Sequence, residues 1–234
     1  MSSPSDTATV IRRMAREAGA GTGHAGKSSP EGTDTTEGAT GLGDMRLETA
    51  LLLAALAALG VAVALVFLAY GIQPDLRATV SGDPFRHKLA SMLTLAGGGI
   101  LLVASTGRPG ASRLWVTALL PGIAILAYGA VADQSGYPFL GRSGISVPSC
   151  LGVIILLSIP ALAFIMTVLR TTGVVTRPAL AGAVAGILAG ALGAAAYAIA
   201  CRNDGGLFVA VWYSAAMVAV AVIGALAGRR WLAW

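Results

Sequence analysis

Residues 178–201 read PALAGAVAGILAGALGAAAYAIAC, an apolar stretch without a single charged side chain. About 20 such residues form an α-helix long enough to cross the roughly 30 Å hydrocarbon core of a membrane. Gly182, Gly186 and Gly190 recur every four residues, so they share one helix face on which a second helix can approach closely. The stretch therefore predicts a membrane helix that packs through glycines. Packing inside a helix bundle is favoured over a homodimer, and the oligomeric state is left open.

The rest of the chain has the same apolar character. Of its 234 residues 56% are hydrophobic and 12% are charged, and its mean hydropathy is +0.77. Soluble domains carry roughly 25% charged residues, about twice this share. Six segments have the length of a membrane span: 47–72, 89–105, 114–132, 150–169, 179–200 and 207–228. We therefore expect an all-α polytopic membrane protein with six transmembrane helices over residues 47–234, preceded by a flexible tail over residues 1–46.

The arginines indicate how the spans are oriented. If successive helices alternate in direction, one side of the membrane receives Arg46, Arg108, Arg113, Arg170, Arg177, Arg229 and Arg230. The basic residues of the other side are diluted by Asp75, Asp83, Asp133 and Asp204. Because cytoplasmic loops carry an excess of Lys and Arg, both termini are predicted to be cytoplasmic. The net charge of +5 is explained by this placement, so direct binding of nucleic acid is not expected.

The N-terminal tail contains one segment with helical periodicity, DTATVIRRMAREAG at residues 6–19. Its candidate partner-binding residues are the apolar Val10, Ile11 and Met14 and the basic Arg12, Arg13 and Arg16. A lone helix of about 12 residues is only marginally stable in water, so we expect it to gain order by docking. A protein partner and an anionic membrane lipid surface both fit this pattern. Residues 20–45 have the composition of a flexible tether.

Several functional classes find little support in the sequence. The predicted span interiors lack Asp, Glu, Lys, Arg and His, which ion-coupled transporters keep despite their cost in the membrane. No HExxH, GxSxG or CxxC motif is present, so an enzyme is not expected. A small six-span transporter or channel stays open, and a membrane thiol-disulfide enzyme is a weaker alternative.

Cys150 and Cys201, the two cysteines of the chain, are predicted to lie at the same depth. The short connection RTTGVVTRP at residues 170–178 makes spans four and five an antiparallel hairpin, and the helical rise from this connection to each cysteine is about 30 to 35 Å. Both thiols should therefore reach the outer face. A functional pair, either a reversible disulfide or a thiolate site for a soft metal, is favoured over inert packing or a permanent staple. A metal would need further ligands, for which His87 and Asp204 are available.

The stretch from Cys150 to Trp234 resembles the C-terminal half of a known family of membrane proteins. The similarity runs through LRTTGVVTRPALAGAVAGILAGALGAAAYAIACRNDGGLFVAVWY at residues 169–213 to GALAGRRW at residues 224–231, with GIQPDL at residues 71–76 in the first half. These stretches resemble the NrsF family, negative regulators of extracytoplasmic-function (ECF) sigma factors of the sigma-F type. The resemblance covers roughly residues 45–234.

This resemblance implies a six-span anti-sigma factor of the bacterial inner membrane whose cytoplasmic N-terminus holds an ECF sigma factor. It also implies a paired cysteine required for the response to metal or oxidative stress, and Cys150 and Cys201 occupy the positions of that pair. No cofactor is expected beyond a possible soft metal ion at the two thiols. The residues that fit the family pattern after the second cysteine are Asn203, Asp204, Phe208, Trp212 and Tyr213. Gly205, Gly206 and the long tail depart from the pattern, so no sigma-binding residue is transferred from the family.

Overall fold

The computed structural model describes residues 37–71, 80–107, 113–133, 136, 140, 147–172, 175–201 and 203–233. In 37–46 and 113–115 only the backbone is described. The predicted helix in the tail, with Val10, Met14 and their neighbours, lies outside these ranges. Every regular element of the described residues is a helix, which confirms the all-α fold class.

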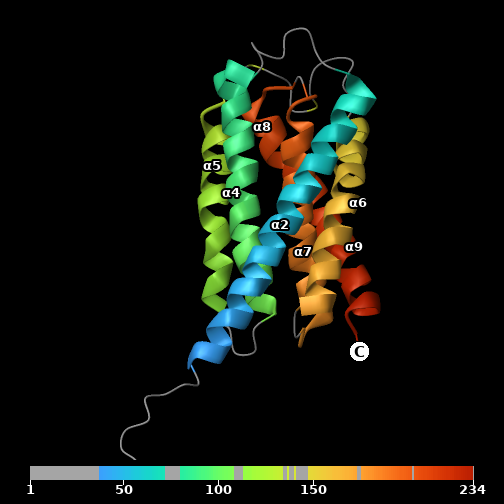
Figure 1. The fold of residues 1–234 in the computed structure, drawn as a ribbon. Helices are drawn as coiled ribbons and strands as arrows, with labels where there is room; N and C mark the ends of the chain where they lie inside the picture. Colours follow the sequence, from blue (N-terminus) through green and yellow to red (C-terminus); the bar gives the residue numbers. More distant parts are fainter. Residues whose placement is uncertain are drawn as a thin grey trace, which may run out of the picture. The chain divides into compact units, whose positions relative to one another are not determined.

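The long helical segments cross the bundle in alternating directions, and two of them are built from consecutive shorter helices (Figure 1). In chain order they are α2 (Glu37–Tyr70), α4 (Asp83–Thr106), the 3₁₀-helix η1 (Arg113–Leu119), α5 (Leu120–Val131), α6 (Val147–Thr172), α7 (Pro178–Tyr197), α8 (Gly206–Phe208), the π-helix η2 (Val209–Tyr213) and α9 (Ser214–Trp231). The starts of α4, α6 and α8 therefore lie at the same end of the bundle as the last turns of α2, α5 and α7.

Five helical stretches are long and apolar enough to cross a membrane: Leu47–Tyr70, Asp83–Thr106, Val147–Thr172, Pro178–Tyr197 and Gly206–Trp231. The sixth predicted span, residues 114–132, is formed by η1 and α5 together, and its apolar helical part Val116–Val131 is shorter. Pro121 stands in the first turn of α5, a position at which helices tolerate proline. The membrane helices are thus supported, whereas the count of six stays a prediction.

The second predicted span begins earlier than the apolar pattern indicated. We expected a helix over residues 89–105, but α4 starts at Asp83, with Gly82 in an extended conformation before it and Pro84 in its first turn. Proline at this position favours the start of a helix even where the side chains that follow are polar. Lys88 is therefore inside the helix and only 2% exposed. The helix of this span therefore carries charged residues in its first two turns, whereas the predicted interior, residues 89–105, holds none.

Helix α7 is the central element, and it packs against α9, α6 and α4. Its glycine face lies against α9: a methyl group at Gly182 would collide with the carbonyl oxygen of Gly224, and one at Gly186 with that of Val220. At Gly190 the nearest atoms belong to Met217 of α9. Of the two uses predicted for these glycines, the structure thus contains the one inside the bundle.

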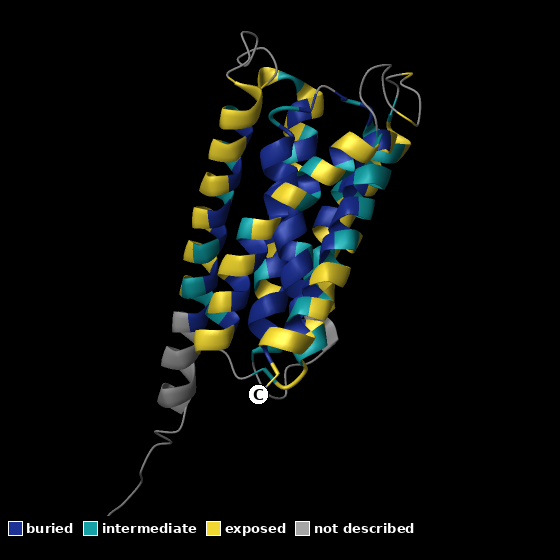
Figure 2. Ribbon diagram, turned by 90° about the vertical axis from the view of Figure 1, so that its right-hand side faces the viewer, coloured by how far each residue is buried: buried dark blue, intermediate teal, exposed yellow. Residues whose placement is uncertain are grey.

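The outer surfaces of the helices are apolar as well. Figure 2 shows the buried residues facing the middle of the bundle and the exposed ones facing outward. In α2 the buried stripe is Leu47, Leu51, Ala55, Ala58, Ala62 and Val66, at the spacing of three or four residues that defines one helix face. Leucines cover its other faces, and Leu68 is 83% exposed. Contiguous exposed apolar surface of this kind suits contact with lipid.

Candidate functional site

Cys150 and Cys201 lie at one end of the bundle, on neighbouring elements. Cys150 is in the first turn of α6, and Cys201 follows the last turn of α7. Both are free thiols, and they are 1% and 4% exposed. The antiparallel packing of α6 on α7 places them at the same end, as the hairpin geometry predicted. Whether they act as a sensor stays a prediction.

Tyr197 connects the two cysteines. As the last residue of α7, it directs its hydroxyl group to the Sγ atom of Cys150 at 3.4 Å. Its carbonyl oxygen accepts a hydrogen bond of 2.9 Å from the backbone N–H of Cys201. The tyrosine ring lies against Tyr70 at the end of α2, with ring centroids 6.3 Å apart. One residue thus contacts both halves of the thiol pair and the first helix.

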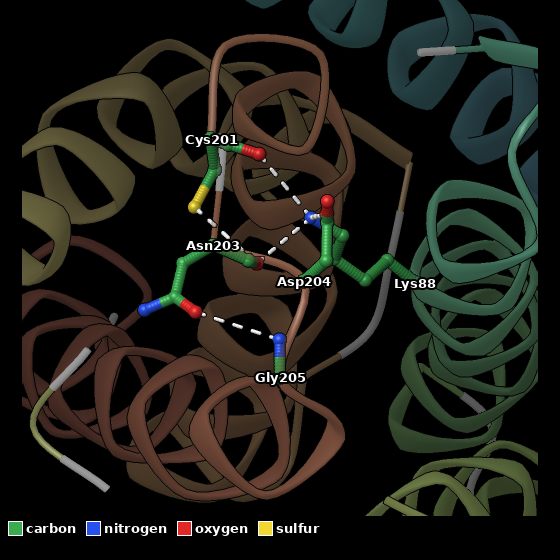
Figure 3. Close-up of polar contacts among 5 residues, drawn as sticks. All are labelled: Lys88, Cys201, Asn203, Asp204 and Gly205. Atoms are coloured by element: carbon green, nitrogen blue, oxygen red, sulfur yellow. Dashed lines mark hydrogen bonds and ion pairs between the residues drawn. The ribbon is translucent and has the colours of Figure 1, made fainter. Parts of the chain in front are cut away.

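Lys88 enters the same region from α4. Its Nζ atom lies 2.7 Å from the Oδ1 atom of Asp204 and donates hydrogen bonds to the carbonyl oxygens of Cys201 and Asn203, at 3.2 Å and 3.0 Å. Figure 3 shows these contacts converging on the ammonium group. The Lys88 side chain is 3% exposed and that of Asp204 is 41% exposed. A buried ammonium group is stable only when it is paired and hydrogen-bonded, as this one is.

The polar turn after Cys201 is built around Asn203. The Oδ1 atom of Asn203 accepts a hydrogen bond of 3.4 Å from the N–H of Gly205, so the side chain supports the turn that leads into α8. Asn203 is completely buried, and its Nδ2 atom has no hydrogen-bond partner. The Sγ atom of Cys201 lies 4.0 Å from the carbonyl oxygen of the same residue. The turn therefore contacts the sulfur of Cys201.

Tyr213 closes the site from the last helix. It ends the π-helical segment η2, a wider turn that is rare in proteins and often marks functional positions. Its side chain is fully buried. The hydroxyl group lies near the sulfur of Cys201 but has no partner at hydrogen-bond geometry. The π-helical turn thus places an unsatisfied polar group beside the thiol.

The surroundings of Cys201 favour its thiolate form. Cys201 lies outside the helices that are long and apolar enough to cross a membrane, in the segment between α7 and α8. The neighbouring Cys150 side chain lowers the pKa of Cys201 most, and the positive charge of Lys88 lowers it further, whereas burial opposes them. The net result is a pKa below the ordinary thiol value. A thiol of lowered pKa reacts with oxidants and soft metals at neutral pH more readily than an ordinary one.

The two residues considered as further metal ligands do not join the thiols as a cluster. Asp204 pairs with Lys88, and His87 lies against Gly129 and the ring of Tyr128 on the α5 side of α4. In the part of the chain that the structure describes, no three His, Cys, Asp or Glu residues are grouped so as to hold a metal ion. A soft metal held by the two thiols stays a prediction.

Four arginines mark the opposite end of the bundle. Arg170 lies in the last turn of α6, Arg177 precedes α7, and Arg229 and Arg230 lie in the last turn of α9. The end of α9 contacts the start of α7, because a methyl group at Gly228 would collide with the carbonyl oxygen at the first residue of α7. The thiols and these arginines are therefore at opposite ends, as the alternation of the spans predicted.

Sequence reasoning missed Lys88 and Tyr197 as members of the site. Lys88 had a usable signal, because it is one of only two lysines in the chain and the other, Lys27, belongs to the tail. Tyr197 precedes Cys201 by four residues, the spacing of neighbours on one helix face. The contact between Tyr197 and Cys150 had no local signal, because 47 residues separate the two positions.

Comparison with known proteins assigns the fold to a family. Residues 36–234 match the model of the family described as negative regulator of sigma F, NrsF. A probable anti-sigma-F factor NrsF from Azospira oryzae is 31% identical over 173 residues, which cover 70% of this chain and 78% of the relative. The anti-sigma-F factor NrsF of Caulobacter vibrioides is 34% identical over 196 residues, with 78% and 88% covered. No solved structure matches the chain.

Proposed function

The chain belongs to the NrsF family of negative regulators of sigma F, and from that membership we propose that it is a membrane-bound anti-sigma factor controlled by its two cysteines. The proposed partner is an ECF sigma factor, held in the cytoplasm by the tail of residues 1–46. The signal is a chemical change of Cys150 and Cys201 that ends this binding. The observation that carries the proposal is the convergence of the two cysteines of the chain at one buried polar site.

The proposed orientation follows from the arginine end of the bundle. An excess of basic residues is typical of the cytoplasmic side, so Arg170, Arg177, Arg229 and Arg230 support cytoplasmic termini. For a sixth crossing, the 3₁₀ and α-helical parts of η1 and α5 together rise about 32 Å, close to the hydrocarbon thickness. In the inner membrane of a bacterium, the thiols would then face the periplasm, an oxidising compartment.

The proposed chemistry is the reversible formation of a disulfide between Cys150 and Cys201. With hydrogen peroxide as the oxidant, the two thiols give up two electrons and two protons, the S–S bond forms, and the peroxide leaves as two molecules of water. The lowered pKa of Cys201 supports it as the thiol that reacts first. A soft metal ion bound by both sulfurs in place of their protons is the other chemistry that would respond to stress at this site.

The energy of a disulfide limits how complete the switch can be. Moving an equilibrium from 1:99 to 99:1 takes about 5.5 kcal/mol. Closing the loop of about 50 residues between the cysteines is worth about 4 kcal/mol in the chain-entropy model. Even if all of these roughly 4 kcal/mol favoured one of the two states, an equilibrium that starts at 1:99 would reach only roughly 9:1. Disulfide formation alone would therefore give a partial switch.

A binding assay on the full-length chain tests the proposal. The chain in lipid nanodiscs is immobilised in its reduced form and exposed separately to each sigma factor of the host. We expect one ECF sigma factor to be retained, and hydrogen peroxide or Cd²⁺ to reduce its retention. The control is Cys150→Ser with Cys201→Ser, which should retain the sigma factor under both conditions. Retention of no sigma factor by the reduced chain would contradict the proposal.

One observation favours a small transporter or channel as a second candidate. Lys88 is a buried charge inside an apolar helix, and such residues often belong to a transport pathway. Reconstitution of the chain into liposomes tests this alternative. A solute flux that is lost in Lys88→Met, together with an absence of sigma-factor binding, would replace the regulatory function by transport.

A further inference from the structure

The ammonium group of Lys88 uses all of its hydrogen-bonding capacity on one short segment. An ammonium group has three N–H donors, and Lys88 has three acceptors: the Asp204 carboxylate and the carbonyl oxygens of Cys201 and Asn203. All three acceptors lie within residues 201–204, which are more than 110 positions from Lys88 along the chain. Lys88 thus ties this segment to α4.

The backbone of Cys201 depends on this tie because α7 has already ended. The N–H of Cys201 donates to the carbonyl oxygen of Tyr197, the last bond back to the helix. The carbonyl oxygen of Cys201 accepts from Lys88. The residue is therefore held on its N-terminal side by α7 and on its C-terminal side by α4 (Figure 3).

The other thiol is held independently of Lys88. Cys150 belongs to the first turn of α6, and the hydroxyl group of Tyr197 lies 3.4 Å from its sulfur. The relative position of the two sulfurs is consequently set by α6 and Tyr197 on one side and by Lys88 on the other. A change at Lys88 should move Cys201 and leave Cys150 in place.

The burial of this charge is not required by packing. Removing an ammonium group from water is costly, and buried ion pairs can often be replaced by apolar residues without loss of stability. Lys88 is 3% exposed and has a partner, Asp204, that is partly open to solvent. The burial of Lys88 is better explained by a positioning role, in which the lysine fixes the place of residues 201–204, than by a role in packing.

We propose that Lys88 is a positioning residue for the thiol pair: by tying residues 201–204 to α4, it holds the Cys201 sulfur where a bond to Cys150 can form. This inference rests on the proposed function in one respect, that the two thiols react with each other. Loss of Lys88 should therefore change the equilibrium between dithiol and disulfide, while the helices themselves stay packed.

Exchange with mercaptoethanol and its disulfide measures that equilibrium. One protein thiolate attacks a sulfur of the small disulfide and forms a mixed disulfide, releasing one mercaptoethanol. The second protein thiolate attacks the mixed disulfide, forms the Cys150–Cys201 bond and releases a second mercaptoethanol. The protein loses two electrons and two protons, and the reagent gains them, so the equilibrium constant follows from the disulfide fraction in buffers of known composition.

The experiment uses the full-length chain in nanodiscs, without a sigma factor. The test variant is Lys88→Met, which keeps the length and apolar stem of the side chain and removes its donors. The matched control is Arg86→Met, which removes a positive charge from the same turn of α4, where the arginine is 68% exposed and pairs with Asp83. Asp204→Asn leaves Lys88 with both carbonyl contacts. Thermal unfolding of each reduced variant is measured alongside.

Lys88→Met should lower the equilibrium constant for disulfide formation about tenfold or more, the scale of losing charge-assisted hydrogen bonds. Asp204→Asn should lower it less, and Arg86→Met should leave it within about twofold of the unchanged chain. A Lys88→Met constant within twofold of the unchanged chain would overturn the proposal, as would a lower unfolding temperature with an unaltered constant. If Lys88→Met does not fold, Lys88→Gln is judged by the same criteria. Because no sigma factor is present, failure here is distinguishable from failure of the proposed function.

Discussion

The contact between α7 and α9 allows a stability prediction of defined sign. A methyl group added at Gly186 would lie 2.5 Å from the carbonyl oxygen of Val220 and 2.6 Å from the Cα atom of Ala221, both backbone atoms of α9. Ordinary van der Waals contact begins at 3.4 Å, so Gly186→Ala would force the helices apart by about 0.9 Å. At Gly97 in α4, by contrast, an added methyl group meets nothing within 4 Å.

The magnitude follows from two opposing terms. Overpacking of a well-packed interior costs about 1 to 3 kcal/mol. Replacing glycine by alanine within a helix gains up to about 1 kcal/mol. Gly186→Ala should therefore lower the free energy of unfolding by about 0 to 3 kcal/mol, whereas Gly97→Ala should raise it by up to about 1 kcal/mol.

Thermal unfolding of the two purified variants in the same detergent measures the difference. For a chain of this size, about 1 kcal/mol corresponds to a shift of about 2 to 4 °C in Tm. The Tm of Gly186→Ala should thus lie about 2 to 12 °C below that of Gly97→Ala. Equal values, or a more stable Gly186→Ala, would refute the close packing of α7 on α9.

Three further predictions concern the thiols and the tail. Formation of a disulfide between Cys150 and Cys201 should stabilise the chain by up to about 4 kcal/mol. Thermal unfolding of oxidised and reduced samples measures this gain. A serine at either position should abolish it. In the reduced, unsubstituted chain, the first thiolate absorbance should appear at a lower pH than that of an ordinary thiol, because the Cys150 side chain and Lys88 lower the pKa of Cys201. Because folding lowers this pKa, the thiolate adds to the free energy of unfolding at pH values above the pKa of the unfolded thiol. This contribution is lost as the pH falls through the pKa of Cys201 in the folded chain. A midpoint of the thiolate absorbance at or above about pH 8.5 would contradict the prediction. In the tail, Ile11→Ser combined with Met14→Ser should weaken sigma-factor binding about tenfold or more if these residues dock on the partner. Titration calorimetry measures the affinity. An unchanged affinity would count against that role.

The elements that were predictable from the sequence are those specified by local pattern. Long apolar segments gave the helices, and glycines four residues apart gave the packing face of α7, because both are periodic signals within one element. The common depth of Cys150 and Cys201 followed from the short connection between two antiparallel helices.

The remaining features depend on contacts between distant segments. The start of α4 was misplaced because an apolar count treats His87 and Lys88 as loop residues, whereas the structure buries Lys88 by pairing it with Asp204. That ion pair forms only when α4 lies beside the end of α7, which no local pattern encodes. The π-helical turn that brings Tyr213 to Cys201 likewise had no signal in hydropathy, because the residues of η2 are as apolar as those around them.

The central claim is that the state of the two thiols controls the bound sigma factor. The most direct measurement follows both quantities in one sample: the full-length chain in nanodiscs, loaded with its sigma factor, is oxidised stepwise, and the bound sigma factor and the fraction of Cys150–Cys201 disulfide are quantified at each step. The account predicts that sigma factor is lost in proportion to the disulfide formed and rebinds on reduction. Sigma factor that stays bound while the disulfide forms completely would contradict it.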